Sequence, residues 1–300
     1  WNENIFFFLA LFLFIALFLS ELYLKKIGLG DPVRYDSNIL YGYAPKINQS
    51  KNRFKNSKVT INESGLRTID NWKLSKKKKI VFLGDSVTYA GSYIDDKDTF
   101  VHKVCGELKN FICGNAGVNA YGIKNIVMRS KYDKRLQDAE IFIYLFPPGD
   151  FYREYSNSKT AHFYLNNKSF IFPAITEAVS FVATKYDINN YISKYDDGKH
   201  KNEDKIKLIN YSISILADEI KNKKIKKKVF VFLSNEKNDK DLNSNLNKYI
   251  KENLVSEIGE INFLNNVLND DKYFYDESVH FNEKGHKIVA NEIIRLITEN

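Results

Sequence analysis

Short apolar runs alternate with amphipathic stretches over most of the chain after residue 78, and this alternation predicts the fold. Five runs rich in Val, Ile and Phe predict buried strands at residues 79–83, 111–118, 140–146, 228–234 and 261–264. Apolar residues at helical spacing predict helices over residues 210–220 and 285–297. Buried strands separated by helices are typical of a doubly wound parallel sheet. We therefore expect an α/β domain with a five-stranded parallel sheet over residues 76–300.

The start of the chain has a different pattern, an unbroken apolar run over residues 5–19 followed by a second short one at 22–24. Fifteen residues of helix reach roughly 22 Å, and the second run brings the length close to the hydrocarbon thickness of about 30 Å. No small-x-small cleavage site follows, so we expect residues 1–24 to be an uncleaved membrane anchor rather than a signal peptide. A buried core helix is the alternative.

Two polar stretches interrupt these patterns. Residues 25–75 are rich in turn formers and contain short alternating pieces, which predicts a strand-and-loop segment packed beside the main domain. Residues 151–205 form a long insertion between the third and fourth strands, with an aromatic start and a hairpin-like stretch at 162–171. Insertions above strand ends commonly form lids and substrate walls.

Composition narrows the classes of function. The chain has 300 residues, 44% of them hydrophobic, and a net charge of +8. The lysine runs at 76–79 and 221–228 directly precede predicted strands, and zinc-finger spacing, RNA-binding aromatics and basic heptad helices are all missing. We therefore expect no nucleic-acid partner. Residues 84–91 lack the lysine of a phosphate loop, which argues against a nucleotide-binding or redox domain, and we expect no metal and no cofactor.

The location of the main domain depends on two conflicting signals. Glu3 precedes the apolar run and Lys25 and Lys26 follow it, which favours a cytoplasmic body by the positive-inside rule. Cys105 and Cys113, the two cysteines of the chain, could form a disulfide in an oxidising compartment or remain free thiols. A disulfide would place the body outside the cytoplasm, which is the location that we expect.

The candidate chemistry begins at Gly84-Asp85-Ser86, where the first predicted strand ends. In open α/β sheets ligands bind at the carboxyl ends of the strands, so Ser86 would be presented there. A serine hydroxyl needs a general base, and His280, with Asp276 and Glu277 just before it, offers a base and an acid that orients it. Asp85 is expected to cap the helix that follows the strand.

These blocks and their order resemble the SGNH, or GDSL, hydrolase superfamily. Gly84-Asp85-Ser86 resembles its first block, residues 114–122 (Gly-Asn-Ala-Gly-Val-Asn-Ala-Tyr-Gly) its second, and the acid and histidine before residues 281–286 its last. Residues 62–67 resemble the lead-in of membrane-anchored members. The resemblance implies a flavodoxin-like three-layer sandwich and acyl-ester hydrolysis or transfer. It places the acid three residues before the histidine, at Glu277, although a one-residue bulge would bring Asp276 there.

The resemblance also implies an oxyanion hole with three donors. Two would be the backbone N–H groups of Ser86 and Gly117. The third is an Asn side chain in a Gly-x-Asn-Asp block after the third strand, and here Gly149 stands at the Asn position. Either Asn119 substitutes, or the Gly149 backbone donates, or the protein binds ligands with little catalysis.

Two functions therefore remain open. The first is a membrane-anchored serine esterase or O-acyltransferase that acts on an ester of an envelope glycan or lipid, with Ser86 and His280 as catalytic residues. The second is a glycan-binding or assembly protein on the same fold, which Gly149 suggests. His286 is expected to pack at the start of the last helix rather than to bind metal, since no second ligand stands at zinc spacing.

Overall fold

The computed structural model describes residues 2–28, 32–53, 56–156, 202–221, 227–233, 252, 262–263, 271–275 and 280–299. Its centre is a sheet of five parallel strands in the order β6-β5-β7-β8-β9. The strands are β5 (Lys78–Leu83), β6 (Phe111–Asn115), β7 (Ile141–Phe146), β8 (Lys227–Phe232) and β9 (Asn262–Phe263). Numbered along the chain this order is 2-1-3-4-5, the flavodoxin-like arrangement. The predicted fold class is confirmed.

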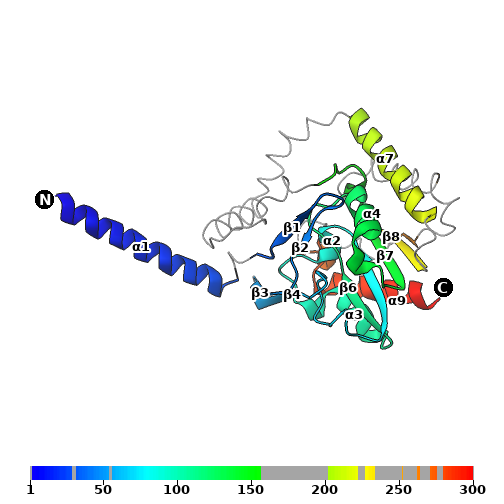
Figure 1. Cartoon of the computed structure of the whole chain (residues 1–300), viewed down its shortest axis with the longest axis horizontal. Helices are drawn as coiled ribbons and strands as arrows, with labels where there is room; N and C mark the ends of the chain where they lie inside the picture. The colour runs from blue at the N-terminus through cyan, green and yellow to red at the C-terminus, as the bar shows by residue number, and fades with distance from the viewer. Residues whose placement is uncertain are drawn as a thin grey trace.

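Helices cover both faces of the sheet (Figure 1). On one face lie α3 (Phe100–Glu107) and α9 (Glu283–Thr298), which contact each other. On the other face lie α4 (Ile123–Tyr132) and α7 (Asn202–Lys221). Successive side chains of β7 enter opposite cores, Ile143 and Leu145 on the α3 side and Tyr144 and Phe146 on the α4 side. A sheet buried on both faces explains why its strands read as continuous apolar runs.

The second strand ends at Asn115, three residues before the predicted end. The chain nevertheless stays beside β5, because Ala116 and Val118 donate backbone hydrogen bonds to the carbonyls of Phe82 and Gly84. A Cβ atom on Gly117 would lie 2.3 Å from the backbone nitrogen of Tyr89, so only glycine lets this loop approach so closely.

The polar stretch before the sheet forms two antiparallel pairs. They are β1 (Tyr35–Asn38) with β2 (Gly42–Pro45), and β3 (Gln49–Arg53) with β4 (Ser57–Ile61). The Tyr43 hydroxyl donates to the Asn119 carbonyl at 2.6 Å, and the Tyr121 hydroxyl donates to the Tyr43 carbonyl. The segment is therefore tied to the loop that follows β6, one of the loops at the carboxyl edge of the sheet.

The helix α1 (Asn2–Lys26) extends away from the sheet in Figure 1. Within it, Asn4–Leu24 has 21 residues and a mean hydropathy of 2.7, and none of its most apolar stretch is buried against the protein. The helix is long and apolar enough to cross a membrane. A signal sequence has the same length and composition.

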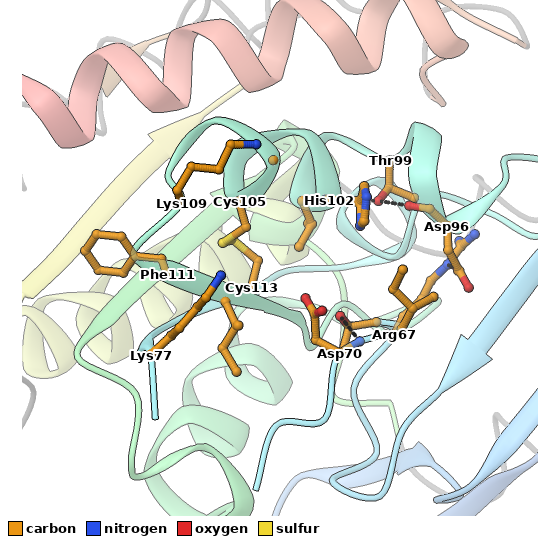
Figure 2. A pocket seen from close by; sticks show the side chains of 15 residues that line it. Arg67, Asp70, Lys77, Asp96, Thr99, His102, Cys105, Lys109, Phe111 and Cys113 are labelled. Atoms are coloured by element: carbon orange, nitrogen blue, oxygen red, sulfur yellow. Dashed lines mark hydrogen bonds and ion pairs between the residues drawn. A yellow bond between two sulfur atoms is a disulfide. The ribbon is translucent and has the colours of Figure 1, made fainter. Parts of the chain in front are cut away.

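Cys105, in α3, is disulfide-bonded to Cys113 in β6. Figure 2 shows this bridge in the wall of a hollow of about 210 Å³, with Lys77, His102 and Lys109 around it. The lining of the hollow includes neither Ser86 nor His280. The sequence left the state of the two cysteines open, and the structure joins them.

Candidate active site

Ser86 begins the short helix α2 (Ser86–Tyr89), three residues after the end of β5. Asp85 is the N-cap, and its Oδ1 accepts a hydrogen bond of 2.8 Å from the Val87 N–H. This confirms the predicted capping role of Asp85. Because β5 and β7 are the strands where the chain order reverses, Ser86 stands at the topological switch point of the sheet.

His280 meets Ser86 from the other end of the chain, with Nε2 3.0 Å from the serine Oγ. Its loop is anchored on both sides: Phe274 and Phe281 form an antiparallel bridge, and the Tyr275 N–H donates to the His280 carbonyl at 2.7 Å. The Asn282 side chain then caps α9. A base within hydrogen-bond reach of a serine hydroxyl is the geometry that nucleophilic activation requires.

One tyrosine lies beside the imidazole, and a second stacks on the first. The ring of Tyr93 lies edge-on to His280, with centroids 6.4 Å apart, and stacks on Tyr275 at 4.1 Å. Such contacts restrict the ring of His280 to few orientations. Asp276 and Glu277, the two acids proposed to orient His280, lie outside the described residues.

Arg67 holds the chain that follows α2. Its buried guanidinium pairs with Asp96 at 2.9 Å and donates to the carbonyls of Tyr89, Gly91 and Ile94. These carbonyls lie at the end of α2 and in the loop after it, so a single side chain from the N-terminal segment fixes the course of that loop. Sequence analysis offered only a resemblance for residues 62–67, with no role for the arginine.

The predicted oxyanion donors differ in their present partners. The Gly117 N–H donates to the Asn115 side chain at 2.8 Å, so an oxyanion would compete with Asn115 for it. The Asn119 Oδ1 is buried and accepts no hydrogen bond within the part of the chain that the structure describes. Ala120 has a φ of 63° in the left-handed region, a conformation that non-glycine residues adopt most often at turns and functional sites.

An acidic pair and an arginine lie directly beside Ser86. Arg153 Nη1 donates to Asp150 Oδ1 at 3.0 Å and to the Tyr121 carbonyl at 2.6 Å, and it lies 3.4 Å from Asp85 Oδ2. The same Asp85 Oδ2 lies 3.4 Å from Ser86 Oγ. The arginine thus joins the ends of β5 and β7 to the loop after β6.

The environment of the Asp150 carboxyl group disfavours its charged form. Burial, reinforced by the charge of Asp85 and a hydrogen bond to it, raises the pKa of Asp150 well above its usual range. A carboxyl group with a raised pKa keeps its proton to a higher pH, so Asp150 carries less negative charge beside Arg153 than an ordinary aspartate would.

The chain offers no metal site in the parts that the structure describes, where no group of three His, Cys, Asp or Glu side chains converges. His286 is fully buried in α9, with its ring stacked on Phe100 and edge-on to Phe281. This confirms the predicted packing role of His286.

Several residues of the site were missed by sequence reasoning. Arg153, Asp150 and Tyr93 were not predicted, although Asp150 and Arg153 stand three apart at the start of an insertion that follows a strand end. That spacing on one turn is the signal that could have paired them. The position of Tyr93 beside His280 depends on the tertiary structure.

Known proteins resemble this chain in fold rather than in sequence. No family model and no curated protein matches the chain. Among solved structures, a carbohydrate esterase matches with 10% identity and a TM-score of 0.46, covering 89% of this chain and 96% of that one. An acetylxylan esterase from Geobacillus stearothermophilus matches with 15% identity and a TM-score of 0.43, covering 75% and 96%. A member of the lipolytic G-D-S-L family from Veillonella parvula matches with 12% identity and a TM-score of 0.41, covering 75% and 100%.

These matches are of the class that the sequence motifs predicted. Identities of 10–15% and TM-scores under 0.5 carry nothing about the reaction or the substrate of this chain. The flavodoxin-like strand order is established by the chain's own sheet.

Proposed function

We propose that the chain is a serine esterase or O-acyltransferase. The observation that carries the proposal is the 3.0 Å approach of His280 Nε2 to Ser86 Oγ, between residues 194 positions apart, at the carboxyl edge of the sheet. Either residue alone has ordinary structural uses at turns and helix ends. Their contact at the topological switch point is what a nucleophile and its base require.

The reaction would proceed through an acyl-enzyme. Ser86 Oγ attacks the acyl carbon while its proton passes to His280 Nε2, and the carbonyl oxygen becomes an oxyanion. The bond to the leaving alcohol then breaks as His280 returns the proton to it. Water, or the hydroxyl of an acceptor, gives its proton to His280 and attacks the acyl-enzyme, which releases an acid or a new ester. Asp276 or Glu277 would accept a hydrogen bond from Nδ1.

The oxyanion would be held first by the Ser86 N–H at the start of α2. Gly117, Asn119 and the Gly149 backbone remain candidates for the further donors, and Gly117 would have to release Asn115 to act. Removing one oxyanion donor costs about 2.7 to 4 kcal/mol of transition-state stabilisation. The donors therefore determine the rate, even where the nucleophile and the base are well placed.

Attachment of the protein to a membrane through α1 would limit the substrates that its site can reach. An apolar helix such as α1 would hold the site near a membrane, which suits an ester of an envelope glycan or lipid better than a diffusing metabolite. The Cys105–Cys113 disulfide supports a body outside the cytoplasm, against the Lys25 and Lys26 signal, because disulfides persist in oxidising compartments.

The direct test is turnover of p-nitrophenyl acetate by the full chain in detergent micelles, compared with Ser86→Ala. We expect the variant to lose at least 10³-fold in kcat, since the nucleophile is gone. A fluorophosphonate probe should label the wild type and leave Ser86→Ala unlabelled. Equal rates and equal labelling in the two proteins would remove the proposal.

A second candidate is a glycan-binding or assembly protein without catalysis. Gly149, which has no side-chain amide, and the engaged N–H of Gly117 favour it. Such a protein would bind acetylated oligosaccharides with equal affinity in the wild type and in Ser86→Ala, and neither would release acetate. Acetate release by the wild type alone would exclude this candidate.

A further inference from the structure

Two neighbouring side chains border the space next to Gly149 into which an asparagine side chain would extend. A Cβ atom built on Gly149 would lie 3.7 Å from the Tyr152 hydroxyl and 3.9 Å from Arg153 Nη2, both at ordinary contact distance. In the resemblance to SGNH hydrolases, this is the position from which the third oxyanion donor comes. We propose that the Arg153 guanidinium supplies the oxyanion donor that Gly149 lacks, an inference that rests on the proposed esterase function.

The contacts of Arg153 hold it beside the nucleophile. Three acceptors, namely Asp85, Asp150 and the Tyr121 carbonyl, all lie against the single nitrogen Nη1. One of them, Asp85 Oδ2, is also within 3.4 Å of Ser86 Oγ. The Arg153 guanidinium and the Ser86 hydroxyl therefore both contact the same oxygen atom, Asp85 Oδ2.

The same arrangement leaves donors for a ligand. A guanidinium has five N–H groups in a fixed fork, and within the described chain the Nε and Nη2 groups of Arg153 donate to no other residue. The side chain keeps 37% of its surface exposed and lines an open hollow of about 350 Å³ together with Gly149, Tyr152 and Glu154. Arg153 thus presents unused N–H groups to a space that a substrate can enter.

The positive charge of Arg153 strengthens the hydrogen bonds that it can donate. Arginine stays protonated at any pH at which the protein is folded, and hydrogen bonds from a charged donor are roughly twice as strong as neutral ones. Asn119, the alternative side chain, makes no hydrogen bond to Asp85 or Ser86 among the described residues.

The test uses the full chain in detergent micelles and initial rates with p-nitrophenyl acetate. Arg153→Ala should lower kcat by about 10²- to 10³-fold with little change in KM, the loss typical of one oxyanion donor. Adding Gly149→Asn to Arg153→Ala should restore at least tenfold, because the asparagine amide then reaches the vacated space. In the wild-type background, Gly149→Asn should change kcat by less than tenfold, since the added amide competes with Arg153 for one oxyanion.

Arg135→Ala is the matched control. Arg135 is also a partly exposed arginine paired with a carboxylate, Asp133 at 2.7 Å, and it takes no part in the site. Its removal should cost comparable stability and leave kcat within twofold. Thermal melting of every variant separates loss of folding from loss of the donor.

Three results would overturn the inference. The first is a kcat of Arg153→Ala within threefold of the wild type. The second is a folded double variant in which Gly149→Asn does not restore the kcat lost by Arg153→Ala. The third is a kcat of Gly149→Asn alone that exceeds the wild type 10²-fold or more. The last applies even if Arg153→Ala fails to fold, because a Cβ at position 149 meets no backbone. A wild type no faster than Ser86→Ala would remove the proposed function and this inference together. An active wild type that Gly149→Asn accelerates 10²-fold or more would remove only the inference.

Discussion

Two histidines near the start of α9 have opposite environments. His280 is half-buried and lies against the Ser86 hydroxyl, whereas His286 is fully buried and accepts a hydrogen bond on Nδ1 from the Phe100 N–H. Burial, aided by the nearby charges of Arg67 and Lys103 and by His280, lowers the pKa of His286 to about 3. His286 therefore remains neutral at every pH at which an esterase is ordinarily assayed.

The lowered pKa of His286 predicts a loss of stability in mild acid. In the unfolded chain this histidine binds a proton below a pH of about 6.5, whereas in the folded chain it stays neutral down to about 3. The stabilisation is present above pH 6.5 and is lost as the pH falls towards 3, by about 2 kcal/mol between pH 7 and pH 5. Urea unfolding at both pH values measures it.

The control variant is His286→Asn, whose amide oxygen can still accept from Phe100 but does not titrate. It should be less stable than the wild type at pH 7, because the smaller side chain leaves a cavity. Its unfolding free energy should fall about 2 kcal/mol less than that of the wild type between pH 7 and pH 5. Parallel curves for the two proteins would contradict the assignment.

At the residue scale, the sequence singled out Ser86 and His280, which the structure brings into contact, but not the residues around them. Ser86 could be placed because it ends an apolar strand, and His280 because it follows acids in the expected order. Arg153 could not be placed, since its role depends on the approach of three loops that are distant in the sequence. The importance of Gly149 was predicted, whereas the side chains that fill its space depend on tertiary contacts.

At the scale of elements, the disulfide joins the helix α3 to the strand β6 of the sheet. Cys105 lies in α3 and Cys113 in β6, so the bridge closes a short loop between a helix and the strand that it precedes. Closing a loop of about ten residues is expected to stabilise the fold by about 2 to 3 kcal/mol. The hollow of Figure 2 has this bridge in its wall, which makes the bridge accessible to reductants on that side.

Replacing both cysteines by alanine should lower the free energy of unfolding by about 2 to 3 kcal/mol, because the unfolded chain regains the freedom of the loop. Urea unfolding with and without dithiothreitol measures this change. The reductant should destabilise the wild type by a similar amount and leave the double variant unaffected. If the reductant frees both thiols of the wild type and its unfolding curve does not change, the disulfide does not stabilise the fold.

Elements were predicted better than their boundaries. All five strands were found, because a parallel sheet that is buried on both faces produces continuous apolar runs. The strand predicted over residues 111–118 ends at Asn115, since the apolar positions that continue after it belong to a loop packed against α2. The predicted hairpin at 162–171 lies outside the described residues.

At the scale of the whole molecule, the folded body and α1 have separate physical requirements. The body buries its apolar residues in two cores, one on each face of the sheet. The large side chains of α1 are exposed instead, for example Phe6 at 70% and Phe12 at 72%. Water would make such exposure unfavourable by roughly 1.5 to 3 kcal/mol per side chain, so α1 requires an apolar environment outside the protein.

Removal of residues 2–24 should therefore convert a membrane-bound protein into a water-soluble one without changing its fold. The full chain should stay with membranes after alkaline carbonate extraction, and the truncated chain should remain in the supernatant with the same melting temperature to within a few degrees, because α1 adds nothing to the cores. Fluorophosphonate labelling at Ser86 should be equal in the two.

The matched control is Phe12→Arg in the full chain, which places a charge at the centre of the apolar stretch and should weaken insertion by about 2.5 to 3.5 kcal/mol. Recovery of the full chain from the soluble fraction, with the peptide before Lys26 removed, would identify α1 as a signal sequence instead of an anchor.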